Sequence, residues 1–355
     1  MEIKYQKYEV CFLLQLSQDL DLLLPLMEQL KLKGTAFCCL IVNKIINKSP
    51  RITKALDSRD IKYKIASQSD FFCMLKTILS SQRIVSAVET NARAHRFSYR
   101  CTLISRILRK KTFTMQHGFE NIGLTYSDRE FPIEDVRIAS DKIFIWGDEK
   151  TLHKRIPGKT KKKCISVGSS KTYPLSSRLN FGEKFTVSFF ENLHWNRYSD
   201  FYRKQFFKDL RALSEKYSSV QFLLKPHHAG QWTTKNRKTN HEFPSNVLIL
   251  DPMDARWEPY TGPEYILASN LVVTTPSTIA CDAAIMGKPV VVVAYDLSLE
   301  AYNPLPLMRQ EEDYCKAIEE VIMKTKDHLF YAQEFIAKNL TNTQAAEKIV
   351  NLILD

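Results

Sequence analysis

The sequence predicts an α/β protein with two halves, each a parallel β-sheet wrapped by helices in the Rossmann manner. The chain has 355 residues, more than one hydrophobic core normally serves, which favours two domains. Val290–Val293 and similar runs are continuously apolar and β-branched, as in parallel strands that are buried on both faces. Strand-like and helix-like runs alternate along the chain, which is typical of right-handed β–α–β crossovers.

The first half contains five strand-like runs with helical patterns between them. The expected strands are residues 9–16, 36–42, 83–88, 112–116 and 142–146, and the clearest helices are residues 20–32 and 94–109. A basic stretch that contains Gly158, Ser169 and Ser170 then interrupts the alternation, so we expect a hinge between about residues 160 and 180. The predicted domains are residues 1–165 and 166–355.

Alternation resumes in the second half. Strands are expected at residues 185–190, 221–224, 247–250, 271–274 and 290–293, helices at 202–216 and 279–286, and a terminal helical region at 313–354. In such folds, ligands bind at the carboxyl ends of the strands. Two Rossmann-like halves with ligands in a cleft between them are the expected architecture.

Composition narrows the class of protein. Eight cysteines are scattered without a C-x-x-C pair, which predicts reduced core residues in a cytosolic protein and no zinc site or disulfide frame. The N-terminus is too charged for a signal peptide, and no apolar run is long enough to span a bilayer. The net charge of +12 calls for an anionic partner. Nucleic acid is one candidate, although no zinc-finger or RRM-type signature is present. An anionic membrane or a phosphorylated substrate is the other.

Two basic clusters, residues 106–111 and 159–163, are candidates for attachment to an anionic membrane. The alternative is that each is an ordinary solvated face, which is the commoner meaning of a run of charge.

Polar residues collect directly after the expected strands. The first half supplies Glu89, Gln116, His117, Glu120 and Asn121, and the second supplies Glu191, Lys225, His227, His228, Ser277 and Thr278. The lysine, histidines and hydroxyls of the second half suit a phosphate or carboxylate. For Ser277 and Thr278 the alternative is a simple helix N-cap. His117 and the three glutamates are acid/base types, suited to activating an acceptor hydroxyl or attacking a sugar.

Four motifs together resemble a known family. "MQHGFENIGLTYSD", "SFFENLHW", "LLKPHHAG" and "TTPSTIACDAAIMGKPVVVV" are similar to the GT-B glycosyltransferases of bacterial capsule and lipopolysaccharide synthesis. The nearest match is to the retaining β-Kdo transferases, which use CMP-Kdo. The resemblance implies a GT-B fold, with two Rossmann-like domains facing across a cleft and a C-terminal helical segment. It also implies transfer of Kdo to a glycan acceptor of a lipopolysaccharide O-antigen or capsule, at the cytoplasmic face of the inner membrane.

The resemblance assigns roles by position. His227, Ser277 and Thr278 would hold the CMP phosphate or the donor carboxylate, and Gln116, His117 and Glu120 would line the acceptor side. From their places after the expected strands, we also expect Lys225 beside the nucleotide sugar, and Glu89 and Asn121 on the acceptor side. His228 stands where the family has a proline, which leaves open whether His227 or His228 contacts the phosphate. Glu191 is expected as the nucleophile, and Glu120 with His117 as the acid/base groups. The sequence has no D-x-D-like pair in a convincing position, so we expect a metal-independent enzyme without a cofactor.

Two alternatives remain open at this stage. One is a transferase of the same fold that uses CMP-sialic acid or CDP-glycerol. The other is a non-enzymatic protein whose basic surface binds nucleic acid or serves as a scaffold.

Overall fold

A computed structural model describes residues 8–47, 49–67, 70–227, 230, 232–236, 243–325 and 327–355. The chain forms two compact units, one running to Thr172 and taking in Asn339–Asp355, and the other spanning Tyr173–Lys338. The change of unit at residues 172/173 lies within the expected hinge. The expected domains differ from these units in two ways, since their boundary was placed at residue 165 and they assigned the terminal residues to the second domain.

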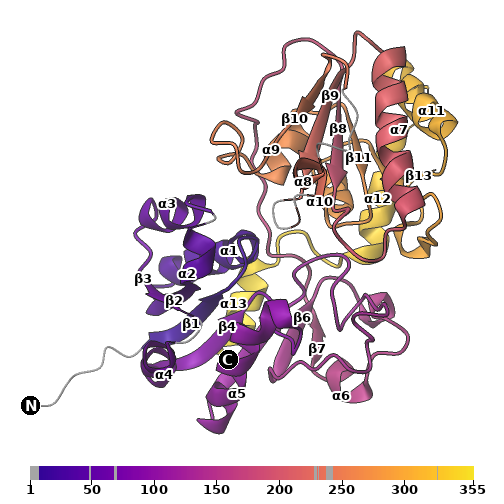
Figure 1. The fold of residues 1–355 in the computed structure, drawn as a ribbon. Coiled ribbons are helices and arrows are strands. Elements are labelled where there is room, and N and C mark those ends of the chain that lie inside the picture. Colours follow the sequence, from indigo (N-terminus) through magenta and orange to yellow (C-terminus); the bar gives the residue numbers. More distant parts are fainter. Residues whose placement is uncertain are drawn as a thin grey trace, which may run out of the picture. The chain divides into compact units, whose positions relative to one another are not determined.

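The first unit is a parallel sheet of seven strands in the order β3-β2-β1-β4-β5-β6-β7 (Figure 1). Its strands are β1 (Tyr8–Leu14), β2 (Phe37–Val42), β3 (Tyr63–Ala66), β4 (Ser81–Ser86), β5 (Lys111–Met115), β6 (Lys142–Ile145) and β7 (Cys164–Ser166). Its helices are α1 (Asp19–Leu32), α2 (Asn43–Ile46), α3 (Arg51–Asp57), α4 (Phe71–Leu79), α5 (Arg96–Ile107), α6 (Gly158–Lys161) and α13 (Ala346–Leu354). The central strand β1 is almost entirely buried, as its apolar sequence YEVCFLL predicts.

The last helix, α13, belongs to the first unit because its apolar stripe and flanking backbone find partners there. Ile349, Val350 and Ile353 are buried, and the helix packs against α1. The backbone N–H of Ala345 donates to the carbonyl of Ser169 at 2.9 Å, and the Lys111 ammonium donates to the Asp355 carbonyl at 2.6 Å. The helical pattern of these residues was expected, but the unit on which they pack was not.

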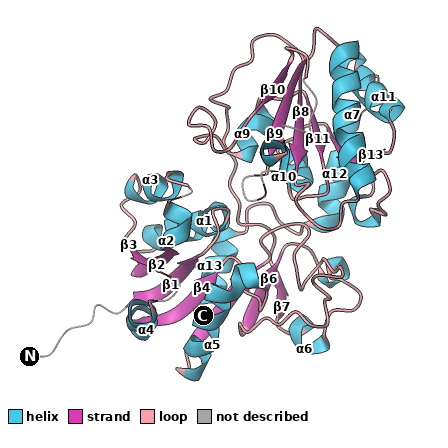
Figure 2. Ribbon diagram, viewed as in Figure 1, coloured by secondary structure: helices cyan, strands magenta, loops and turns pink. Residues whose placement is uncertain are grey.

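The second unit has six parallel strands in the order β10-β9-β8-β11-β12-β13 (Figure 2). They are β8 (Thr186–Glu191), β9 (Gln221–Pro226), β10 (Val247–Ile249), β11 (Leu271–Thr274), β12 (Val290–Val293) and β13 (Leu307–Met308). The helices are α7 (Asp200–Lys216), α8 (Trp232–Lys235), α9 (Gly262–Leu267), α10 (Ile279–Ile285), α11 (Glu311–Met323) and α12 (His328–Asn339). Aromatic side chains from β8, β9 and α7 form much of the core, among them Phe189, Phe222 and Phe206.

All ten strands expected from the sequence are present within a few residues. β3, β7 and β13 were not expected, because they are short and mostly half-buried, and so lack the continuous apolar pattern. None of the described helices is both long and apolar enough to cross a membrane.

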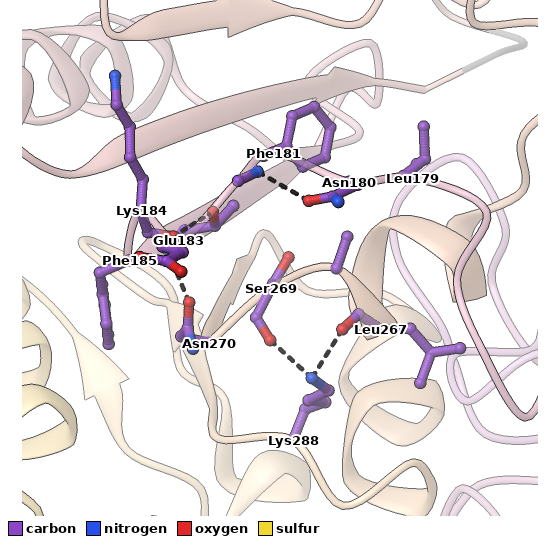
Figure 3. A pocket seen from close by; sticks show the side chains of 13 residues that line it. Leu179, Asn180, Phe181, Glu183, Lys184, Phe185, Leu267, Ser269, Asn270 and Lys288 are labelled. Carbon is purple, nitrogen blue, oxygen red and sulfur yellow. Dashed lines mark hydrogen bonds between the residues drawn. The ribbon is translucent and has the colours of Figure 1, made fainter.

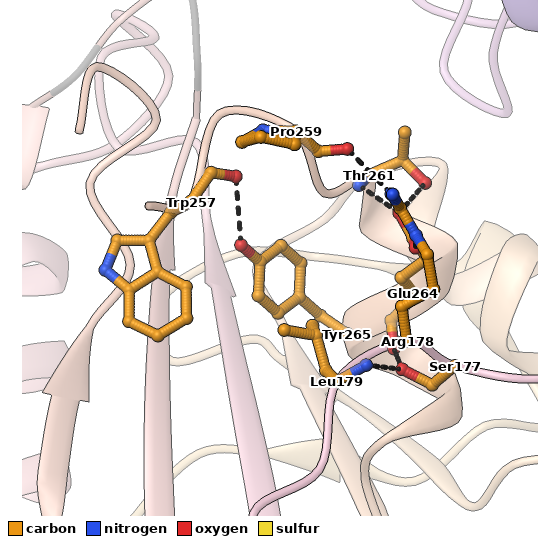
Figure 4. A network of polar contacts seen from close by, with 8 residues as sticks. All are labelled: Ser177, Arg178, Leu179, Trp257, Pro259, Thr261, Glu264 and Tyr265. Carbon is orange, nitrogen blue, oxygen red and sulfur yellow. Dashed lines mark hydrogen bonds and ion pairs between the residues drawn. The ribbon is translucent and has the colours of Figure 1, made fainter. Parts of the chain in front are cut away.

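A bidentate ion pair fastens the start of the second unit to α9 (Figure 4). Arg178 contacts Glu264 at 2.6 and 3.1 Å and donates to the carbonyl of Pro259 at 2.9 Å. Glu264 also accepts from the backbone N–H of Thr261 at 2.9 Å, which closes a capping box at the N-terminus of α9. This network fixes the segment that enters β8.

A pocket of about 380 Å³ lies beside the same segment (Figure 3). It is lined by residues around Thr186 and Asn270, at the amino ends of β8 and β11. Lys288 reaches its wall and donates to the carbonyls of Leu267 and Ser269, each at 2.8 Å, so it caps the C-terminal end of α9. Because ligands of such sheets bind at the carboxyl ends of the strands, this pocket is at the wrong edge to be the expected site.

Candidate functional site

The strand order of the second unit places its candidate site beside β8 and β11. From β8 the chain passes to β9 and then β10 in one direction, and it returns to lay β11 on the other side of β8. This reversal is a topological switch point, where the loops after neighbouring strands diverge and leave room for a ligand. Glu191 ends β8, His227 follows β9, and Thr275 follows β11, so three of the polar segments predicted from the sequence converge there.

Glu191 is buried, and both of its carboxylate oxygens accept hydrogen bonds. One oxygen accepts from the backbone N–H of Leu193 at 2.7 Å, and the other from the hydroxyl of Thr233 in α8 at 2.8 Å. Burial raises the pKa of Glu191, while these bonds and one from the backbone of His227 oppose the rise. The carboxylate thus holds together the loop after β8, the loop after β9 and α8. A nucleophile needs an oxygen open to the substrate, and Glu191 is 3% exposed.

Two histidines lie against each other beside this carboxylate. The rings of His194 and His227 have centroids 4.7 Å apart. Burial, and secondarily the nearby Lys235, lower the pKa of His194 to about 4, so it is neutral at pH 7. Its Nδ1 is buried and has no hydrogen-bond partner among the described residues. A Cβ on Gly230 would lie 2.0 Å from the His194 ring, so this close approach requires glycine.

His194 was not among the site residues expected from the sequence. The signal that could have found it is its position three residues after Glu191, in the same loop. His228 lies outside the described residues.

Lys225 lies on β9 beside Phe190 of β8. Its ammonium is 5.5 Å from the centroid of the Tyr265 ring in α9, a cation–π distance. The lysine is half-buried, at the same edge of the sheet as His227.

The hydroxyl-rich segment after β11 is built largely on Asn192. The Thr275 hydroxyl donates to the Asn192 side-chain oxygen at 2.7 Å, and the Asn192 amide group donates to the carbonyl of Pro276 at 2.9 Å. The Tyr198 hydroxyl donates to the same Asn192 oxygen. These bonds join the ends of β8 and β11 across the switch point, so Thr275 and Asn192 shape the site rather than face a ligand.

Ser277 and Thr278 follow on the same segment, and both are half-buried. The Ser277 hydroxyl contacts that of Thr274 at 2.9 Å and accepts from the backbone N–H of Ile279 at 3.3 Å. Thr278 occupies the N-cap position of α10 without a side-chain capping bond. Ser277 therefore caps the helix through the long hydrogen bond from Ile279. The Thr278 side chain makes no capping bond. Asp282 accepts from the Tyr173 hydroxyl at 2.9 Å.

In the first unit, Glu89 follows β4 and holds a neighbouring turn. Its carboxylate accepts from the backbone N–H groups of Ser140 at 2.6 Å and Ala139 at 3.2 Å. It is 1% exposed, and burial raises its pKa to about 7 against the opposing effect of these bonds and of Lys163. Glu89 therefore positions the turn before β6, as Glu191 positions its own loops.

The loop after β5 presents a histidine in a defined orientation. The side-chain oxygen of Asn121 accepts from the backbone N–H of His117 at 3.0 Å and lies 2.8 Å from its Nδ1. Because that oxygen only accepts, Nδ1 carries the proton and Nε2 is the basic nitrogen. Burial lowers the pKa of His117 to about 4. A neutral imidazole with a fixed basic nitrogen is the arrangement of a general base.

The neighbours of His117 support the loop. Gln116 is buried, donates to the carbonyl of Gly118 and accepts from the backbone N–H of Trp146, each at 3.0 Å. Glu120 lies half-buried in the same loop. The ring of His95, which the sequence did not single out, packs edge-on to His117 with centroids 5.7 Å apart.

No three His, Cys, Asp or Glu side chains come together as a metal-binding group within the described part of the chain.

Comparison with known proteins identifies relatives of the fold only. The sequence matches no protein-family model, and it matches no curated protein. A solved structure from Listeria monocytogenes, assigned as a UDP-N-acetylglucosamine 2-epimerase, is similar with a TM-score of 0.67 and 16% identity, over 98% of this chain and 96% of that one. The UDP-GlcNAc 2-epimerase from Neisseria meningitidis, bound to UDP-GlcNAc, gives 0.63 and 12% over 98% and 99%. The wall teichoic acid polymerase TagF gives 0.60 and 11% over 99% and 89%.

These similarities show the fold. The chain has the GT-B fold, built from two Rossmann-like units. The identities are too low to transfer an activity.

Proposed function

We propose that the protein is a glycosyltransferase that moves a sugar from a nucleotide donor to a glycan acceptor in the synthesis of a bacterial surface polysaccharide. The observation that carries the proposal is the His194–His227 pair beside the switch point of the second unit, where Rossmann-like sheets bind nucleotides. The Neisseria protein of the same fold was solved bound to a nucleotide sugar, UDP-GlcNAc, which supports a donor of that class.

CMP-Kdo is the proposed donor, on the strength of the four motifs that resemble the β-Kdo transferases. In this proposal His227 donates a hydrogen bond to the phosphate, and Lys225 supplies positive charge at the same edge. Ser277 and Thr278 offer their hydroxyls to the donor, and His228 is the alternative phosphate contact. The transfer uses neither metal nor cofactor, so EDTA should leave the rate unchanged.

On the acceptor side, His117 takes the proton of the attacking hydroxyl through Nε2. Asn121 holds the His117 ring in the required tautomer, and Gln116 fixes the loop. Glu120, three residues after His117 in the same loop, is the second acid/base group. Glu89 contributes by holding the turn at Ala139 and Ser140. The protein would act at the cytoplasmic face of the inner membrane.

Retention of configuration, which the resemblance implies, requires a nucleophile opposite the departing CMP. Because Glu191 is 3% exposed, it can act as the nucleophile only if the loops that it holds first release it. We therefore propose that Glu191 positions the His227 loop, and that its service as the nucleophile depends on such a release.

The test is incubation of the protein with CMP-Kdo and a mixture of lipopolysaccharide or capsule acceptor glycans, with CMP release and glycan mass as readouts. A Kdo-sized mass increase with stoichiometric CMP release is expected, and the anomeric configuration of the product follows from NMR. The same assay with CMP-sialic acid or CDP-glycerol identifies a different donor. Binding of an RNA oligomer without any transfer would favour the non-enzymatic alternative.

A second candidate is epimerisation of a UDP-sugar, favoured by the fold similarity to two UDP-GlcNAc 2-epimerases over nearly the whole chain. Incubation with UDP-GlcNAc in D₂O separates the two functions. Epimerisation would incorporate deuterium at C2 of the sugar, whereas a CMP-Kdo transferase leaves UDP-GlcNAc unchanged.

A further inference from the structure

Helices α4 and α5 lie side by side on one face of the first unit's sheet (Figure 1). Their inner sides join the same hydrophobic core, to which α4 contributes Met74 and Ile78 and α5 contributes Phe97 and Cys101. The outer sides of the two helices are therefore directed away from that core, and together they form one surface, here called the α4–α5 face.

The α4–α5 face carries large apolar side chains in solvent. Phe72 is 83% exposed and Ile107 is 80% exposed. Phe71, Leu79 and Leu103 are also exposed. Phe72 and Leu79 are seven residues apart, and Leu103 and Ile107 four apart, so each pair shares one side of its helix. The first unit's other large exposed apolar side chains among the described residues, Leu32 and Ile65, belong to α1 and β3. Soluble proteins seldom cluster such residues without a partner.

The same face is rimmed by cations. Arg106, Arg109, Lys110 and Lys111 line a depression of about 290 Å³ with Asp141 as its one acidic residue. The Lys110 ammonium donates to the carbonyl of Leu79 at 3.4 Å, which brings the basic end of α5 to the apolar end of α4. Arg106 pairs with Asp141 at 3.1 Å, and the Lys111 ammonium donates to the Asp355 carbonyl at 2.6 Å, so the lining of the depression carries more positive than negative charge. Lys76 on α4 and Arg100 on α5 are also exposed.

We propose that the α4–α5 face docks the protein on an anionic lipid bilayer. Phe72, Leu79, Leu103 and Ile107 enter the boundary between headgroups and acyl chains, and the cations contact lipid phosphates. The exposed apolar side chains and the cations together favour a lipid bilayer over other partners. A nucleic acid would use the cations, and its bases could stack on phenylalanine, but it would leave the exposed leucines and isoleucine in water. The core of a protein interface is depleted of charge.

The second basic cluster expected from the sequence lacks the apolar part. Lys161 pairs with Glu149 at 3.1 Å, and the Lys163 ammonium donates to the carbonyl of Ile138 at 3.0 Å. None of the described residues of this stretch is a large exposed apolar side chain. The two clusters thus differ, and only the one at residues 106–111 forms part of a docking face. This inference stands on the exposed face alone and does not depend on the donor sugar.

The test is co-sedimentation of the full chain with vesicles of phosphatidylcholine alone, or mixed with phosphatidylglycerol, at low and raised NaCl. The unaltered protein should bind the anionic vesicles, and less so at raised salt. Phe72→Ser with Ile107→Ser should lower partitioning at least about tenfold. Arg100→Gln with Arg109→Asn should lower it about fivefold per cation at low salt. Asn suits the position of Arg109, whose φ is 55°.

A matched control is Leu32→Ser with Lys33→Gln at the C-terminal end of α1, which removes an apolar side chain as exposed as Ile107 and one cation. It should bind as the unaltered protein does. Thermal unfolding midpoints check that each variant folds. Ile107→Trp gives a second readout, because its added fluorescence should shift to the blue on anionic vesicles.

Three results would overturn the proposal. The first is equal vesicle binding by all variants. In the second, sedimentation velocity shows that Phe72→Ser with Ile107→Ser converts a dimer to a monomer while vesicle binding stays unchanged, which would make the face a contact between two copies of the chain. In the third, the protein binds an RNA oligomer but no vesicles, and the arginine variant alone loses that binding.

Discussion

The two units place a buried glutamate at the same kind of position, at or just after the end of a central strand, yet the histidines of their candidate sites differ. Glu89 holds the backbone of Ala139 and Ser140, and Glu191 holds Leu193 and Thr233. Burial raises the pKa of both carboxylates. In each unit, a carboxylate that the sequence suggests for the reaction accepts hydrogen bonds from the surrounding loops.

The two histidines differ in the hydrogen bonding of their Nδ1 atoms. His117 has its Nδ1 hydrogen bonded to Asn121, whereas the Nδ1 of His194 is buried with no partner among the described residues. An unsatisfied buried polar group costs about 1–3 kcal/mol. The first unit therefore holds its histidine in one defined tautomer, and the second leaves a buried polar atom without a partner among the described residues. In the proposed function, the edge that carries His117 serves proton transfer and the edge that carries His194 and His227 serves nucleotide binding.

The largest expected effect separates these tasks. His117→Ala should lower the rate of sugar transfer by about 10²–10⁴-fold, because it removes the general base. It should leave CMP affinity unchanged, since CMP is assigned to the second unit. Kinetics with CMP-Kdo and calorimetry with CMP measure the two quantities. A normal rate of sugar transfer in His117→Ala would show that the first unit does not supply the general base.

Asn121→Ala tests whether the tautomer of His117 matters for transfer. It should lower transfer less than His117→Ala does, because the imidazole remains and only its tautomer is released. The pH profile is the additional readout. In the unaltered protein the acid limb of kcat/KM, which reports the free enzyme, should lie near pH 4, the pKa to which burial lowers His117, and not near the ordinary value of about 6.5.

A second prediction concerns Glu89 and pH. Its pKa is raised from 4.5 to about 7 in the folded protein, so the folded state binds a proton that the unfolded state releases between these values. The stability it contributes is present below about pH 4.5 and is lost as pH rises to about 7, by up to about 3 kcal/mol.

Glu89→Gln should flatten that part of the stability profile, as measured by urea unfolding from pH 4.5 to 8. The contribution of Asp19, whose pKa burial also raises to about 7, should remain in the variant as an internal reference. An identical pH dependence in both proteins would show that Glu89 does not titrate as its burial implies.

The third prediction tests whether Glu191 positions its loops as Glu89 does. Glu191→Gln and Thr233→Val should each lower the free energy of unfolding by about 1–3 kcal/mol, because each disrupts the same buried hydrogen bonds. Both should also weaken CMP binding, since the His227 loop loses its support. If Glu191→Gln instead keeps its stability and CMP affinity but loses transfer, Glu191 is the nucleophile that the motif resemblance implies.

Much of the fold follows from the sequence, because the continuous apolar strands report burial on both faces without knowledge of their partners. The packing of α13 does not follow, since the stripe formed by Ile349, Val350 and Ile353 fits either unit equally well as a pattern. Similarly, the edge of the sheet at which Glu191 lies was predictable from its place at the end of a strand. The hydrogen bond from the Thr233 hydroxyl to Glu191 joins residues 42 positions apart. Such a long-range contact leaves no local signal in the sequence.

The same limit applies to the histidines. The place of His227 after a strand and the resemblance of its motif selected that residue. His194, in the neighbouring loop, was not selected, because its ring contact and burial are visible only in the structure. The glycine that permits this contact, Gly230, is also recognisable only in three dimensions.

Calorimetric titration with CMP tests the central claim, that the edge beside β8 and β11 binds the nucleotide, most directly. The account predicts that CMP binds the unaltered protein and binds more tightly than UDP. It predicts that His227→Ala weakens CMP binding about 10–150-fold, the loss of one charge-assisted hydrogen bond, while His117→Ala binds CMP normally. A large loss in His228→Ala alone would move the phosphate contact by one residue. CMP binding that is equal in the unaltered protein, His227→Ala and His228→Ala would contradict the claim.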